Sequence, residues 1–200
     1  MMWLSPAWDE VTYWALDLET GGLDARRDAI VAVGMVPIEH GVIRLSETFE
    51  SLVRPNVSDV IEPDSVAVHA LVPAEVRGAP ALPEVLAEVD RRVAGQVLLV
   101  HNEAIDVAFL RRAYAQSGMK WPRPAVVDTV KLLFKLAKRR RFLEPDAQQR
   151  EPQINLSLAR QELGLPAYGA HNALVDALAA AELFLVLRAR LDARTLRDLR

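Results

Sequence analysis

The sequence contains no cysteine among its 200 residues. This absence excludes disulfide bonds and metal sites built on thiolates, and it fits a reducing compartment. No stretch reaches the ~18 uninterrupted apolar residues of a membrane-spanning helix, and the first residues lack the basic region and apolar run of a secretion signal. We therefore expect a soluble protein of the cytoplasm.

The chain also lacks a large excess of either charge, with 24 Lys and Arg against 27 Asp and Glu and a net charge of −3. This balance argues against a protein that coats nucleic acid through charge alone, although an acidic site that recruits metal ions can still act on a polyanion. At 51% hydrophobic residues, the chain can bury a core. We expect one domain over residues 1–200, with its core at about 11–191.

Two carboxylates interrupt an apolar stretch at residues 13–23, YWALDLETGGL. Side chains alternate faces along a strand, so Asp17 and Glu19 project to the same side. Two like charges that are partly buried raise each other's pKa unless a cation neutralises them. Because Mg²⁺ binds to carboxylates together with phosphate oxygens, the pair is a candidate half of a metal site. The alternative is a pair of solvent-facing charges at a strand end.

The remaining pattern predicts a mixed α/β sheet, because an antiparallel meander is followed by alternating strands and helices. Strands are expected at residues 28–38, 42–53, 96–100 and 124–128. Helices are expected at residues 64–71, 73–77, 83–94, 104–117, 129–141, 155–163 and 172–191.

Two further acids lie inside apolar helical sequence. Asp106 stands in AIDVAFL, and Asp176 in ALVDALAAAELFLVL. Either acid alone is also explained by a solvent-facing position on an amphipathic helix. His171 is expected in the loop before the last helix, with Asn172 as its N-cap. An imidazole titrates near neutrality, so His171 is a candidate general base, and the alternative is an ordinary surface histidine.

A basic segment, KLLFKLAKRRR, occupies residues 131–141. Lys131, Lys135, Lys138 and Arg139 lie within reach of one helix face, which could track a phosphate backbone. The alternative is a solvated helix end whose positive charges favour the helix dipole.

Three segments resemble, in order and spacing, the motifs of the DEDD 3′–5′ exonucleases of the histidine subtype. They are DLET at 17–20, HNEAIDVAFL at 101–110 and HNALVDA at 171–177. The best-known member of that family is the proofreading epsilon subunit of bacterial DNA polymerase III. The resemblance implies a ribonuclease H-like α/β fold, with a central five-stranded mixed sheet flanked by helices.

The resemblance also implies an activity and a set of roles. Asp17, Glu19, Asp106 and Asp176 would hold two Mg²⁺ or Mn²⁺ ions, and His171 would deprotonate the attacking water. The enzyme would hydrolyse terminal phosphodiester bonds of DNA, preferably at single-stranded 3′ ends, and release 5′-mononucleotides. The residues that would contact the substrate are Leu18, Thr20, Leu23, His69, Asn102 and Phe109.

Two other functions stay open at this point. The same fold could trim RNA or short oligoribonucleotides, or it could serve as a catalytically idle docking subunit for nucleic acid or protein. The intact acids argue against an idle subunit, because a binding surface has no reason to keep buried like charges together. The expected partner is a nucleic acid with a single-stranded 3′ end, DNA rather than RNA, with a DNA polymerase or repair complex as a further candidate.

Overall fold

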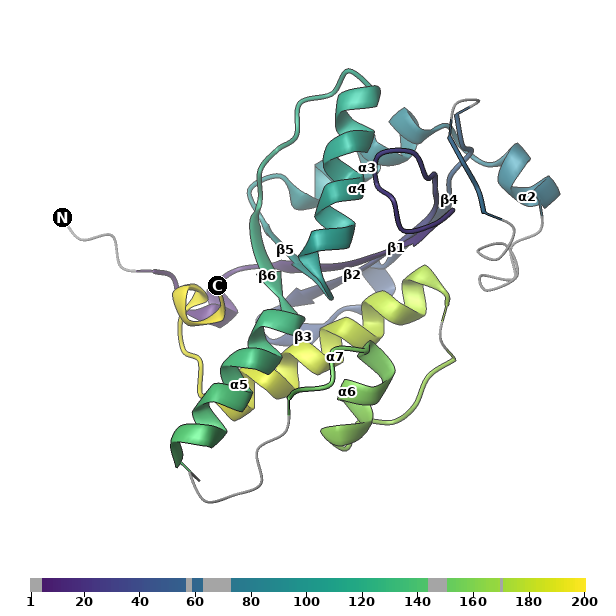
Figure 1. Cartoon of the computed structure of the whole chain (residues 1–200). Coiled ribbons are helices and arrows are strands. Elements are labelled where there is room, and N and C mark those ends of the chain that lie inside the picture. Colours follow the sequence, from purple (N-terminus) through teal and green to yellow (C-terminus); the bar gives the residue numbers. More distant parts are fainter. Residues whose placement is uncertain (1–4, 57–58, 63–72, 144–150, 170) are drawn as a thin grey trace.

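The computed structural model describes residues 5–56, 59–62, 73–143, 151–169 and 171–200. A mixed sheet with helices on both faces forms its centre (Figure 1). The strands follow the order β3-β2-β1-β5-β6, and β4 also pairs with β2. Strand β1 is antiparallel to β2 and parallel to β5, which is parallel to β6. The strands are β1 Tyr13–Thr20, β2 Ile30–Glu39, β3 Val42–Ile43, β4 Phe49–Leu52, β5 Val97–Val100 and β6 Ala125–Asp128.

The mixed sheet is confirmed, but it has six strands where five were predicted. The expected strand at residues 42–53 is divided into β3 and β4 by a short 3₁₀-helix, Leu45–Glu47. Pro37 of β2 lies opposite this interruption, and its carbonyl accepts a hydrogen bond from the Arg44 N–H. Because proline has no N–H to return, the ladder cannot continue there.

The helices lie close to their predicted positions. They are α2 Pro73–Gly78, α3 Leu82–Val93, α4 Glu103–Gln116, α5 Thr129–Leu143, α6 Leu156–Glu162 and α7 Ala173–Leu191. The helix expected at residues 64–71 lies outside the described residues. Within the part of the chain that the structure describes, no helix has the length and apolar character to span a membrane.

Two apolar clusters cover the two faces of the sheet. From β1, Tyr13 and Ala15 face α5 and α7, whereas Leu16 and Leu18 face α3 and α4. Asp17 and Glu19 continue the first series, so both carboxylates project towards α7, at the carboxyl end of β1.

A close backbone contact brings the start of α7 over Asp17. Gly34 of β2 is the cross-strand partner of Asp17, and a Cβ added to Gly34 would lie 2.2 Å from the carbonyl carbon of Ala173. Helix α7 starts at this point because the Asn172 side chain accepts a hydrogen bond of 2.9 Å from the Val175 N–H. The missing side chain of Gly34 therefore lets the first turn of α7 reach the acids of β1.

Candidate active site

Three carboxylates meet where β1 ends under the first turn of α7. Asp17, Glu19 and Asp176 each place an oxygen within 4.8 Å of the other two. The register of β1 with β2 shifts between Glu19 and Thr20, which is an irregularity common beside active sites. The predicted convergence of these three acids on one point is therefore present in the structure.

Asp106 reaches the same region from the other face of the sheet. It lies in the first turn of α4, with a side chain that is 5% exposed. Burial raises the pKa of its carboxyl well above the usual range, and the backbone of Leu18 opposes this only in part. After burial, the charge of Asp106 is the largest influence on the pKa of Asp17. Asp106 is thus a neighbour of the three clustered carboxylates rather than a member of the closest group.

The pKa values of all four acids are raised. For Asp17, burial raises the pKa well above its usual range, and the charges of Asp106, Asp176 and Glu19 add to that effect. Burial and then Asp176 raise the pKa of Glu19 to about 7. The pKa of Asp106 is raised well above its usual range by burial and by Asp128. A bound cation would remove this repulsion, so the arrangement is suited to a metal.

The donor set also fits the expected ions. Carboxylate oxygens are the ligands of hard cations such as Mg²⁺ and Mn²⁺. Asp17, Glu19 and Asp176 supply such oxygens from a rigid strand and a rigid helix. The chemistry of the site therefore agrees with divalent ions, and we assign the individual ligands below as a proposal.

His171 lies in the segment before α7, as predicted, and its side chain is exposed. Its backbone is left-handed, with φ of 69°, and its N–H donates a hydrogen bond of 2.9 Å to the Asp176 carboxylate. That bond and the nearby imidazole lower the pKa of Asp176, although burial leaves it above its ordinary value. A non-glycine residue with positive φ is uncommon and often marks a functional site. His171 is therefore fixed by its backbone beside the acids.

His101 is held differently, although its charge also helps to lower the pKa of Asp176. Its Nδ1 is 2.6 Å from the Thr129 hydroxyl, and its Nε2 is 2.7 Å from the carbonyl oxygen of Ile154. Burial lowers its pKa. Because both ring nitrogens contact protein groups, the His101 ring is poorly placed to accept a proton from water.

Asp128 is a structural acid whose role the sequence did not reveal. Its carboxylate accepts hydrogen bonds from the N–H groups of Asn102, Glu103 and Val130, at 3.0, 3.2 and 2.9 Å. Asn102 has φ of 84°, and no side chain of its own caps α4. Asp128 therefore holds the start of the helix that carries Asp106. The available signal was an acid placed directly after the apolar strand of residues 124–127.

Two residues expected to contact the substrate lie in the core instead. Phe109 is 1% exposed and packs in the cluster beneath α3 and α4. Helix α4 turns this position towards the sheet, and a contact of Phe109 with the substrate strand stays a prediction. Leu18 also points into that cluster, at 9% exposed. Its side chain supports β1.

The other expected contact residues have varied positions. Leu23 is 82% exposed in the loop after β1 and is free to meet a ligand. Thr20 is buried, and its hydroxyl donates a hydrogen bond of 2.7 Å to the Gly22 carbonyl. Asn102 is partly buried at the start of α4, where Asp128 binds its N–H. His69 lies outside the described residues.

Comparisons with known proteins agree with this geometry. The model of the exonuclease family RNase T matches residues 14–184. An epsilon-like protein of DNA polymerase III from Rhodobacter capsulatus is 34% identical over 192 residues, which are 94% of this chain and 25% of that protein. A PolC-type DNA polymerase III from Clostridium perfringens is 31% identical over 171 residues, or 86% of this chain and 11% of the polymerase. The chain thus spans a quarter or less of the length of these curated relatives.

A solved structure confirms the fold. The zinc-bound complex of E. coli Exonuclease I with single-stranded DNA aligns with 91% of this chain and 41% of its own, with a TM-score of 0.74 and 17% identity. The expected ribonuclease H-like fold is therefore correct. The family match over residues 14–184 shows that the chain belongs to the RNase T family of DEDD exonucleases.

Proposed function

We propose that the chain is a single exonuclease domain that removes nucleotides from the 3′ end of DNA. It hydrolyses the terminal phosphodiester bond, prefers single-stranded ends and releases 5′-mononucleotides. The observation that carries this proposal is the meeting of Asp17, Glu19 and Asp176, with Asp106 beside them, in a chain of the exonuclease family.

Asp17, Glu19, Asp106 and Asp176 would hold two Mg²⁺ or Mn²⁺ ions. When bound, such ions lower the pKa of a water molecule, orient it for in-line attack and stabilise the departing 3′ oxygen. The chain supplies carboxylates whose mutual repulsion favours a cation, carried on elements that fix their positions. Asp128 contributes indirectly, because it fixes the start of α4.

His171 would take the proton of the attacking water, as in the histidine subtype. The residue is exposed, and the hydrogen bond from its backbone N–H to Asp176 holds it beside the four acids. An imidazole nitrogen is the most common general base in enzymes.

DNA is the substrate that the relatives favour. The relatives from Rhodobacter and Clostridium are named for DNA polymerase III, and the solved structure of Exonuclease I contains single-stranded DNA. The exposed Leu23 would wedge against the terminal base, and an unpaired end offers that base without the cost of unstacking. We also propose the cytoplasm as its location and a DNA polymerase or repair complex as its partner. RNA is the alternative substrate.

The test uses 5′-labelled single-stranded DNA and RNA of one sequence, with Mg²⁺, Mn²⁺ or chelator. The wild type is compared with Asp17→Ala and His171→Ala, and with Lys120→Gln as a surface control. We expect metal-dependent shortening from the 3′ end, faster on DNA, that Asp17→Ala abolishes and His171→Ala slows by about 10²- to 10⁴-fold. No shortening of either polymer by the folded wild type would refute the proposal. Faster shortening of RNA than of DNA would show that RNA is the preferred substrate.

A further inference from the structure

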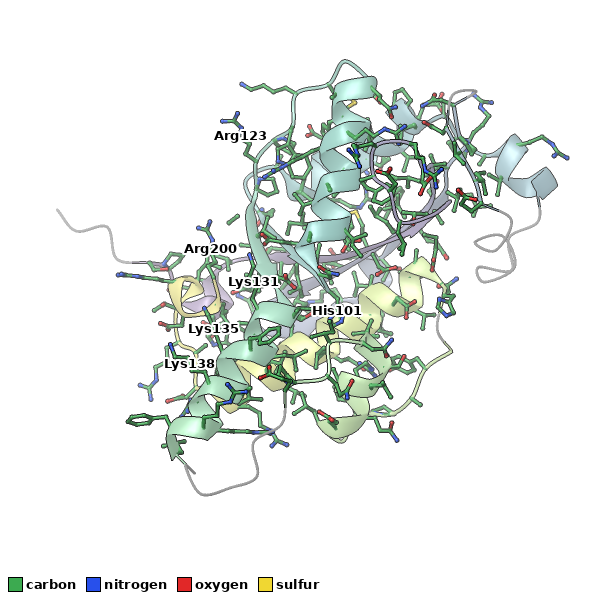
Figure 2. The ribbon with its side chains drawn as sticks, viewed as in Figure 1. His101, Arg123, Lys131, Lys135, Lys138 and Arg200 are labelled. Atoms are coloured by element: carbon green, nitrogen blue, oxygen red, sulfur yellow. The ribbon has the colours of Figure 1, made fainter. Side chains whose placement is uncertain are left out.

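The outer face of α5 combines positive charge with exposed aromatic rings. Lys131, Lys135 and Lys138 recur at helical spacing, and Figure 2 shows the three along one side of α5. At 3.6 residues per turn, Phe134 and Phe142 fall on or beside the same line. Phe134 is 48% exposed and Phe142 is 85% exposed. We call these five residues the α5 stripe.

Nearby acids offset the charge of the stripe only in part. Helix α5 contains no Asp or Glu. Lys131 pairs with the partly exposed Glu103 at 2.7 Å. Lys135 donates to the carbonyl oxygens of Asp198 and Arg200, and its charge helps to lower the pKa of Asp198. In the described part of the chain, no carboxylate pairs with Lys138. A chain of net charge −3 thus concentrates positive charge on this helix.

The exposed rings need a separate explanation. Helix α5 packs against the core through Leu132, Leu133 and Leu136. Phe134 and Phe142 are not among its buried residues. Large apolar side chains exposed side by side with cations mark a binding surface. Lysines that meet phosphates, interleaved with rings on which bases stack, are the usual composition of a site for single-stranded nucleic acid.

The stripe begins beside the acids. Lys131 contacts Glu103, the first residue of the helix that carries Asp106. Thr129, the first residue of α5, contacts His101. From there α5 extends away from the sheet (Figure 1). The twelve residues from Lys131 to Phe142 rise about 16 Å, so the stripe spans several nucleotides of a bound strand.

We propose that the α5 stripe binds the single strand on the 5′ side of the bond that is cut. The lysines bind its phosphates, and Phe134 and Phe142 stack against its bases. This inference rests on the proposed function, because it assumes that the 3′ end of the same strand lies at the four acids. The proposal predicts that long substrates bind better than short ones, because only long substrates reach from the four acids to the α5 stripe.

The experiment measures binding of fluorescein-labelled dT16 by anisotropy in chelator, over a range of salt concentrations. The charge variant is Lys131→Gln with Lys138→Gln, and the aromatic variant is Phe134→Ala with Phe142→Ala. Loss of two phosphate contacts should reduce the slope of log K against log salt by about 1.4. Loss of the rings should weaken binding roughly tenfold or more and leave the slope unchanged. Turnover of dT3, which is too short to cover the stripe, should change less than about twofold in both variants.

Matched controls remove the same charge and a comparable apolar group elsewhere. Arg91→Gln with Lys120→Gln changes two exposed cations near α3 and α4, and Leu45→Ala removes a side chain that is 62% exposed. The controls should bind dT16 like the wild type.

Two results would overturn the proposal that the α5 stripe binds the strand. The first is unchanged affinity for dT16 with an unchanged salt slope in both variants. The second is a loss of dT3 turnover as large as the loss of affinity for dT16. Because anisotropy is read without metal, it distinguishes this failure from failure of the exonuclease itself, which would appear as no shortening of dT3 and dT16 by the wild type with Mn²⁺.

Discussion

Asp106 and Asp128 are equally buried, each 5% exposed, yet they have opposite surroundings. Three backbone N–H groups from two segments donate to Asp128, so its charge is balanced by the protein. Asp106 instead lies near Asp17, and its charge is the largest influence after burial that raises the pKa of Asp17. Burial alone therefore does not distinguish a functional acid from a structural one.

The difference lies in what neutralises each charge. The four acids of the acid cluster, Asp17, Glu19, Asp106 and Asp176, lie together with pKa values raised above their usual range, and a divalent cation would neutralise their charges. Asp128 requires nothing further, because N–H groups satisfy its oxygens. One acid thus organises the backbone, and the others prepare a site for a ligand. The predictions below separate these two roles.

The largest effect is expected from Asp17→Asn, which removes one charge from the acid cluster with little change in volume. Turnover should fall by well over a hundredfold, because even partners outside the direct ligand set typically cost 10- to 100-fold. In metal-free buffer at pH 8 the variant should melt at a higher temperature than the wild type, because repulsion is relieved. Labelled-oligonucleotide shortening and thermal melts measure the two effects. If Asp17→Asn lost stability as well as activity, Asp17 would behave like the structural acid Asp128, and the distinction between the two roles would fail.

Gly34→Ala tests whether α7 must approach β2 to bring Asp176 to Asp17. The new Cβ meets main-chain atoms of Ala173 at 2.2 Å, so the first turn of α7 must move. Overpacking of this kind costs about 1–3 kcal/mol, and a shift of about 1 Å in a catalytic group costs on the order of 10²-fold in rate. Gly78→Ala is the matched control, because nothing lies within 4 Å of its added Cβ. Equal activity of the two variants would show that the contact does not position Asp176.

Asp128→Ala should mainly reduce stability. Three N–H groups lose their acceptor, with an expected cost of about 2–5 kcal/mol in the free energy of unfolding, measured in urea. Asp128→Asn should cost less, because Oδ1 accepts from Asn102 and Val130, and only the Oδ2 contact with Glu103 is lost. Activity of the folded Asn variant should fall at most about 10- to 100-fold. If Asp128→Asn were as inactive as Asp17→Asn, Asp128 would belong to the acid cluster.

The smallest effect is a dependence of stability on pH. Because the folded pKa of Glu19 is about 7, above its ordinary 4.5, the folded state holds a proton that the unfolded state releases between these values. Stability of the metal-free protein should therefore decline as pH rises from about 4.5 to 7, and the raised pKa values of Asp17 and Asp106 act in the same direction. Melting temperatures in chelator should show a shallower decline in Asp17→Asn. Mn²⁺ should stabilise the wild type more at pH 8 than at pH 5, because it binds deprotonated carboxylates.

Most of the fold follows from local patterns that the sequence displays. Apolar runs such as residues 96–100, and the Asn172 cap, mark strands and a helix start close to where they lie. The acids of β1 were also visible, because charges in an apolar strand are conspicuous. The division of β3 from β4 was not predicted, since it depends on the partner strand, where Pro37 faces the gap.

The supporting parts of the site depend on contacts between distant segments. Asp128 contacts residues 26 and 25 positions away, and Gly34 contacts the start of α7. Neither distance can be read from spacing along the chain. The burial of Phe109 was not predicted for a related reason, because family resemblance does not determine which face of α4 turns towards the sheet.

The most direct test of the acid cluster is a titration with Mn²⁺ at pH 8, with 5′-dTMP present to supply phosphate oxygens. Free Mn²⁺ is measured by its EPR signal for the wild type, Asp17→Asn and Asp128→Asn. We expect two bound ions in the wild type, marked loss in Asp17→Asn and retention in Asp128→Asn. Absence of bound Mn²⁺ in the wild type, or unchanged binding by Asp17→Asn, would contradict the assignment of these acids as a metal site.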